Sequence, residues 1–108
     1  MAINPTPPPE MQAEYELIRQ KLEQNTLLEK QLKREITSWK TWFQNLPQVD
    51  KTHELEQLQF EVQWRSERLG ELLQQAQDLQ SEQYDLIAAM DAAMLAQVSP
   101  IADDTDAV

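Results

Sequence analysis

The chain has no cysteine, one glycine and one histidine among its 108 residues. The lack of cysteine excludes disulfide bonds, thiolate metal sites and a cysteine nucleophile. A single glycine excludes the glycine-rich loops that bind phosphate groups. His53 stands one turn before Gln57, where a helical zinc-protease motif would need a second histidine. We therefore predict a non-enzymatic protein with no catalytic residue, no metal, no cofactor and no small-molecule substrate.

Long apolar segments are also missing. The most apolar window covers residues 86–98, LIAAMDAAMLAQV, which is 13 residues long and has an aspartate in its middle. This window is too short and too polar to cross a bilayer. The beginning, MAINPTPPPE, has neither a basic residue nor an apolar run, so we expect no signal peptide. These features predict a cytoplasmic protein.

Positive charge is scarce in the second half of the chain. The formal net charge is -10; residues 1–51 hold seven basic and seven acidic residues, and residues 52–108 hold two basic and twelve acidic ones. Binding to nucleic acid or to an anionic membrane surface requires the opposite sign of charge. Both kinds of partner are therefore excluded, and we expect protein partners, including further copies of the chain.

The residues that are abundant favour long helices. Fifteen glutamines, together with Leu, Glu and Lys, dominate the sequence, and these side chains lose little freedom in a helix. Apolar residues recur with alternating spacings of four and three, which is typical of a coiled-coil seam. The residues predicted to form this seam are Ile18, Leu22, Leu32, Ile36, Trp39, Phe43, Leu55, Leu58, Val62, Leu69, Leu72, Leu79 and Leu86.

Prolines divide the chain into five segments. The prediction is a proline-rich extended arm over 1–9, a helix over 10–46, a turn over 47–52, a second helix over 53–98 and an acidic disordered tail over 99–108. Two long helices joined by a short turn usually fold back on each other. The predicted fold class is therefore all-α, an antiparallel two-helix hairpin of the coiled-coil type, assembled as a dimer or a helical bundle.

Three positions in the middle of the seam are polar: Asn25, Glu29 and Arg65. One interpretation is a hydrated layer whose side chains reach solvent along their apolar stems. The other is a buried Glu29–Arg65 ion pair that fixes the register of the two helices. The sequence leaves both interpretations open.

More apolar residues are present than one seam can use. Phe60 and Trp64 lie about 200° around the second helix from the seam, where four-residue spacing predicts an outward aromatic strip. Residues 88–98 extend past the start of the first helix and are expected to pair with the proline-rich arm, a second copy or a foreign chain. The residues predicted to bind a partner are Trp42, Phe60, Trp64, Leu73, Ile87, Met90, Met94 and Leu95.

These surfaces predict an interaction protein. The main hypothesis is a small scaffold or assembly adaptor within a larger protein complex. The alternative is a chaperone-like binder that shields an apolar segment of a client protein. A parallel homodimeric rod and a plain four-helix bundle of two copies are further possibilities that the sequence leaves open.

Overall fold

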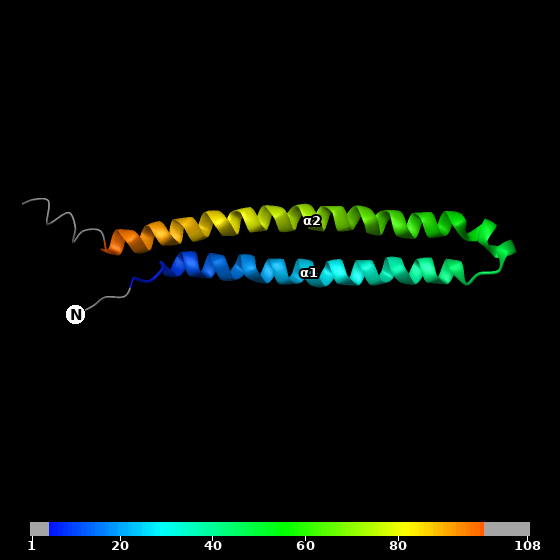
Figure 1. Ribbon diagram of the computed structural model, residues 1–108, viewed down its shortest axis with the longest axis horizontal. Coiled ribbons are helices and arrows are strands. Elements are labelled where there is room, and N and C mark those ends of the chain that lie inside the picture. The colour runs from blue at the N-terminus through cyan, green and yellow to red at the C-terminus, as the bar shows by residue number, and fades with distance from the viewer. Residues whose placement is uncertain (1–4, 99–108) are drawn as a thin grey trace, which may run out of the picture. The chain divides into compact units, whose positions relative to one another are not determined.

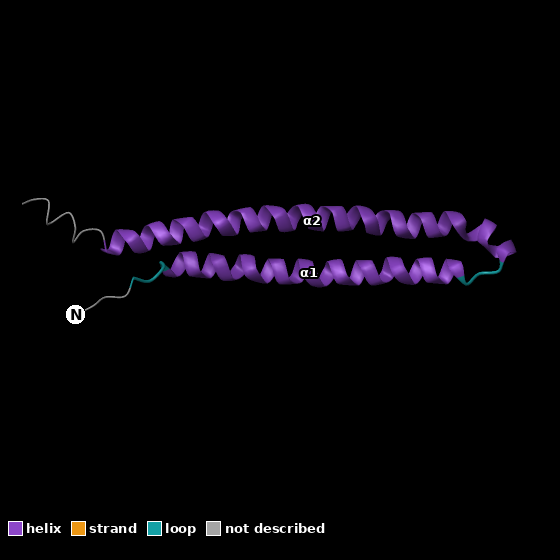
Figure 2. Cartoon of the chain, in the orientation of Figure 1, coloured by secondary structure: helices purple, strands orange, loops and turns teal. Residues whose placement is uncertain are grey.

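The computed structural model describes residues 5–98 of the chain. This part contains two α-helices, α1 (Pro9–Gln44) and α2 (Gln48–Val98), and no strand (Figures 1 and 2). The two helices pack against each other in opposite directions. The fold is therefore the predicted antiparallel two-helix hairpin.

The turn is shorter than the sequence predicts. It covers residues 45–47, because α1 ends at Gln44 and α2 begins at Gln48, five residues earlier than expected. The Pro47 carbonyl accepts hydrogen bonds from the backbone N–H groups of Asp50 and Lys51, at 3.0 and 3.1 Å. Pro47 therefore starts α2 as well as ending α1, because its fixed φ suits the beginning of a helix. The predicted acidic tail, 99–108, and residues 1–4 of the predicted arm lie outside the described residues.

The chain divides into two compact units. The turn unit is Leu22–Gln77, and the terminal unit is Met1–Lys21 with Asp78–Val108, of which 5–21 and 78–98 are described. Each unit contains a segment of α1 and a segment of α2. Their interiors are described separately below.

The core of the turn unit mixes apolar and polar side chains. Leu32 and Leu72 are its buried apolar residues among those described, and Asn25 and Arg65 are buried with them. The Asn25 side chain donates a hydrogen bond to the Leu72 carbonyl of the opposite helix, at 3.3 Å. A buried amide with a partner avoids the cost of an unsatisfied polar group. The interpretation of these positions as a hydrated layer is therefore wrong for Asn25 and Arg65.

The terminal unit holds the proline-rich arm against the end of α2. The backbone N–H of Thr6 donates to Gln97 Oε1 at 3.1 Å, and Gln97 Nε2 donates to the Thr6 carbonyl at 2.6 Å. Gln12 donates through its side chain to Pro7 and through its backbone to Pro8. Ile18 and Leu86 are the buried apolar residues of this unit among those described. Within the chain, the arm therefore contacts the end of residues 88–98 at Gln97.

The burial of side chains follows the predicted seam, except at Leu55 near the turn. Among the predicted seam residues, those on α1 are buried or half-buried, and Leu55 on α2 is exposed. Lys51 and Glu54 are half-buried at this end of α2, where Leu55 is not. The Lys51 ammonium lies 5.9 Å from the centre of the Phe43 ring. A cation over an aromatic face is therefore present at this end of the seam.

Replacement of Gly70 tests whether the middle of α2 is free of contact with another helix. It lies exposed within α2, and a Cβ atom added there would meet no other atom within 4 Å. We expect Gly70→Ala to stabilise the fold by about 0.5–1 kcal/mol, because alanine restricts the unfolded chain and favours helix. Thermal unfolding followed by circular dichroism measures the change. A fall in the melting temperature would show instead that another helix approaches Gly70 closely in the working protein.

Candidate protein-interaction site

All three tryptophans of the chain lie in the turn unit, and two of them contact one arginine. Trp39 and Trp42 belong to α1, and Trp64 belongs to α2. The Arg65 guanidinium carbon lies 4.3 Å from the centre of the Trp64 ring and 5.7 Å from that of Trp39. Guanidinium groups stack favourably on aromatic faces. Arg65 thereby connects an aromatic ring of each helix.

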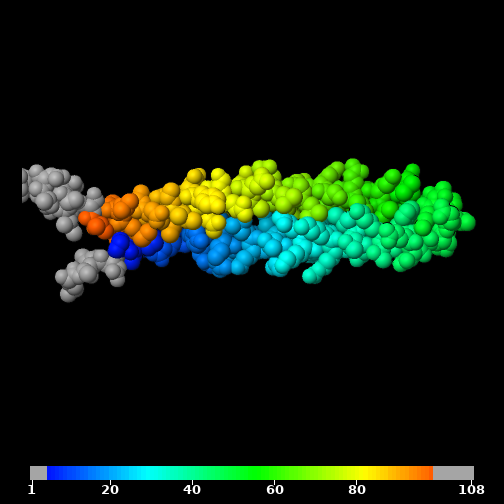
Figure 3. Space-filling view, viewed as in Figure 1, coloured from blue at the N-terminus to red at the C-terminus, as the bar shows by residue number. Residues whose placement is uncertain are grey.

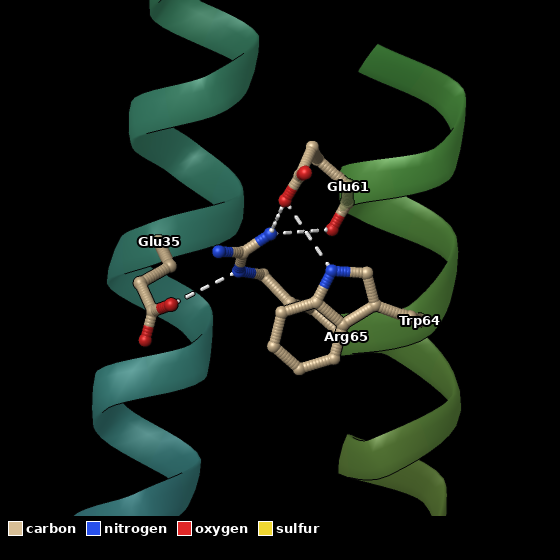
Figure 4. A network of polar contacts seen from close by, with 4 residues as sticks. All are labelled: Glu35, Glu61, Trp64 and Arg65. Carbon is tan, nitrogen blue, oxygen red and sulfur yellow. Dashed lines mark hydrogen bonds and ion pairs between the residues drawn. The ribbon is translucent and has the colours of Figure 1, made fainter. Parts of the chain in front are cut away.

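Two glutamates hold the Arg65 side chain in place (Figure 4). Arg65 Nε donates to Glu35 Oε1 of α1 at 3.0 Å, and Nη1 donates to Glu61 Oε2 at 2.5 Å and to the Glu61 carbonyl at 2.9 Å. The indole N–H of Trp64 donates to the same Glu61 carboxylate at 3.3 Å. The partly buried network therefore joins four side chains from the two helices. Its geometry is fixed by these hydrogen bonds and by the contacts of the Arg65 guanidinium with the Trp39 and Trp64 rings.

The Glu29–Arg65 ion pair, one of the two interpretations that the sequence leaves open, is not formed, and the direction of side chains in a helix explains why. Side chains lean toward the N-terminus of their own helix, which for α2 means toward the turn. On the antiparallel α1, residues nearer the turn have higher numbers. Arg65 therefore reaches Glu35 rather than Glu29, and on its own helix it reaches back four residues to Glu61.

Arg65 and Glu61 shift each other toward the charged forms. The hydrogen bond from Arg65 lowers the pKa of the Glu61 carboxyl, and the bond from Trp64 adds to this effect. Burial alone would lower the pKa of Arg65, but hydrogen bonds and attraction from Glu61 and Glu35 raise it above its ordinary value. Both shifts favour a permanent ion pair. The arrangement is suited to structural support and not to proton transfer near neutral pH.

Trp39 and Trp42 border a shallow apolar hollow. The rings of Trp39 and Trp42 stand nearly perpendicular, with centres 5.3 Å apart and an interplanar angle of 85°. Together with Ser38 and Gln57 they line an open hollow of about 350 Å³. A neighbouring hollow of about 470 Å³ is lined by Lys33, Arg34, Thr37 and Ser38. Because both hollows include Ser38, an apolar and a basic surface adjoin on α1. We call these residues of the two hollows the tryptophan corner.

The side chains of α1 and α2 meet closely in the turn unit, as the space-filling view shows (Figure 3). Trp42 and Trp64 are exposed by 37% and 40%, so each presents part of its ring to solvent. Aromatic residues of this kind are enriched at protein interfaces.

The eight residues predicted to bind a partner do not form one surface. Leu73, Ile87 and Met94 share one heptad position on α2, and Met90 and Met94 are half-buried. Phe60 and Leu95 point away from the seam and are 65% and 69% exposed. Phe60 and Trp64 are both exposed, and the Trp64 ring also lies against the Arg65 guanidinium. The site residues that sequence patterns did not reveal are Ser38, Glu35, Gln57 and Glu61. For Glu61, the four-residue spacing from Arg65 could have indicated an ion pair along the helix.

Other chemistry is not indicated within residues 5–98. No cluster of histidine and acidic side chains there could hold a metal ion, and His53 is exposed. Neither α1 nor α2 has a stretch that is long and apolar enough to cross a membrane.

Comparison of the chain with family models, with curated proteins and with solved structures finds no match to any of them.

Replacement of Arg65 tests whether the network supports the turn unit. We expect Arg65→Met to reduce stability by on the order of 1–3 kcal/mol, because it leaves Glu35 and Glu61 without their partner. Arg68→Met is the matched control, since Arg68 pairs with Glu71 at an exposed position where an ion pair contributes less. Urea unfolding of the two variants measures the difference. Equal losses would show that the Arg65 network has no special structural role.

The lowered pKa of Glu61 predicts a pH dependence. A carboxyl whose pKa is lower in the folded state contributes stability above its ordinary pKa, about 4.3, and loses it as the pH falls through the folded value. We therefore expect Glu61→Gln to lower the melting temperature at pH 7 and the deficit to shrink at acidic pH. Glu71→Gln is the control for the general loss of one negative charge. A deficit for Glu61→Gln that stays constant as the pH is lowered through the acidic range would contradict this role.

Proposed function

We propose that the chain is a non-enzymatic helical interaction protein that acts as a small scaffold or assembly adaptor within a larger protein complex. The observation that carries this proposal is the imbalance between core and surface. Among the described residues, four apolar side chains are buried and thirteen large hydrophobic ones are exposed. Exposed apolar surface on this scale is typical of a protein that is covered by partners.

The shape of the apolar surface supports an adaptor more than an enzyme. The exposed residues lie along two helices on several faces, so more than one partner chain could contact the hairpin. In the turn unit, the network of Arg65 with Glu35, Glu61 and Trp64 holds the tryptophans in a defined geometry. Preorganised aromatic side chains lose little entropy on binding. We extend the proposal to a cytoplasmic location and to action without cofactor or small-molecule substrate.

A second candidate function is a chaperone-like binder of an apolar client segment. The apolar hollow beside Trp39 and Trp42 favours it, because its volume of about 350 Å³ can accept a bulky side chain. A client binder would be marginally stable alone and would gain stability on mixing with its client. A scaffold would instead occur at fixed stoichiometry in one assembly.

Removal of two exposed aromatic side chains tests the proposal. We expect the wild-type chain, in extracts of its native host, to migrate in a particle much larger than its own 12.6 kDa. The double variant Trp42→Ala with Phe60→Ala should migrate closer to the size of the single chain while keeping its helical circular dichroism spectrum. The reason is that truncation of a hot-spot aromatic side chain often costs roughly 2 kcal/mol or more of binding free energy.

The matched control is the double variant Leu27→Ala with Val49→Ala, which also removes exposed apolar side chains. It should leave the size of the particle unchanged. A wild-type chain that migrates as a free hairpin in the native extract would overturn the proposed function. Transient, substoichiometric association with many proteins would favour the client binder.

A further inference from the structure

Two exposed surfaces of the chain are complementary in both polarity and charge. One is the tryptophan corner of the turn unit, which joins an apolar hollow to a basic one. The other is an outward strip on α2 in the terminal unit, which we call the terminal strip and define by Tyr84, Ile87, Asp91 and Leu95. We propose that the terminal strip of one copy of the chain docks on the tryptophan corner of a second copy. This inference rests on the proposed interaction function and names one of its partners.

The terminal strip has the spacing of a helix face that binds in a groove. Its members are three, four and four residues apart, so they follow one another along one side of α2. Tyr84 is 74% exposed, and Ile87 and Leu95 are exposed as well. The proline-rich arm, which bonds to Gln97, leaves these side chains uncovered. An amphipathic face with apolar anchors at such spacings is a common way for a helix to enter an apolar groove.

The tryptophan corner offers a matching receptor. The perpendicular rings of Trp39 and Trp42 form two walls of its apolar hollow, which can receive one apolar side chain of the strip. Trp39 is supported by the Arg65 network. Its geometry therefore exists before binding, which reduces the entropy lost on association.

Charge favours this pairing. Lys33 and Arg34 line the basic hollow, and neither forms an ion pair with another residue of the described chain. The terminal strip contains the exposed Asp91, and Asp85 lies beside it on the same helix. Opposite charges at the edge of an apolar contact set orientation and association rate more than they set affinity. The two basic residues therefore favour a partner helix whose surface is both apolar and acidic. Helix α2 of a second copy has such a surface.

Matched alanine variants of the full chain test the contact. The mass of the protein is measured by sedimentation equilibrium from micromolar to millimolar concentration. We expect a reversible dimer, weakened at least about tenfold by Leu95→Ala or by Trp42→Ala. Leu27→Ala is the control for Leu95→Ala, since the two leucines are 66% and 69% exposed. Phe60→Ala is the control for Trp42→Ala, and neither control should change the dimer constant by more than about twofold.

A charge exchange tests the orientation of the contact. Arg34→Glu alone and Asp91→Arg alone should each weaken the dimer severalfold, because each places like charges together. The two changes in one chain should restore the dimer constant toward the wild-type value, since the pair of charges is then exchanged. Circular dichroism of each variant confirms that the hairpin is folded.

Three results would overturn the proposed contact. The first is a chain that stays monomeric at all concentrations. The second is a dimer whose dissociation constant is unchanged by Leu95→Ala and by Trp42→Ala. The third is a double charge variant that forms a weaker dimer than either single variant. Each of these leaves the proposed adaptor function intact, because a foreign chain could still cover the corner. The adaptor function fails separately, when the chain migrates free in its native extract.

Discussion

Contact between two helices along one narrow stripe is the constraint on which the rest of this structure depends. A hairpin of this kind covers only one side of each helix, so few side chains can be withdrawn from water. Among the described residues, Leu72 is the one large side chain that is almost completely enclosed. Stability must therefore come from many small contributions along the seam, and apolar residues outside the seam remain on the surface.

The Arg65 network shows how a polar group is accommodated within such a seam. A buried arginine without partners would be costly. Here Glu35 and Glu61 neutralise it, and the Trp39 and Trp64 rings stack on its faces. The same contacts that satisfy Arg65 fix the positions of the tryptophans. Support of the seam and shaping of the tryptophan corner are therefore two results of one set of interactions.

The sequence predicted the parts of this structure that depend on periodicity. The two helices and the antiparallel hairpin follow from heptad spacing and from prolines, and Leu32, Leu72 and Leu86 are buried as seam residues. The start of α2 was not predicted, because a proline after a helical segment indicates the end of that helix. Pro47 also begins the next helix, which the pattern does not show. The partner of Arg65 was missed because spacing alone does not give the direction in which a long side chain leans. The Thr6–Gln97 contact involves an arm without periodicity, so sequence patterns could offer it only as one alternative.

The function proposed here follows from what the narrow seam leaves uncovered. If the chain is an assembly adaptor, its exposed tryptophan must be shielded from water in the working protein. Hydroxyl-radical footprinting of Trp42, read out by mass spectrometry, tests this directly by comparing the native extract with the dilute purified chain. We expect strong protection of Trp42 in the extract and none for Leu27, which lies outside the proposed surfaces. Equal oxidation of Trp42 in both samples would contradict it.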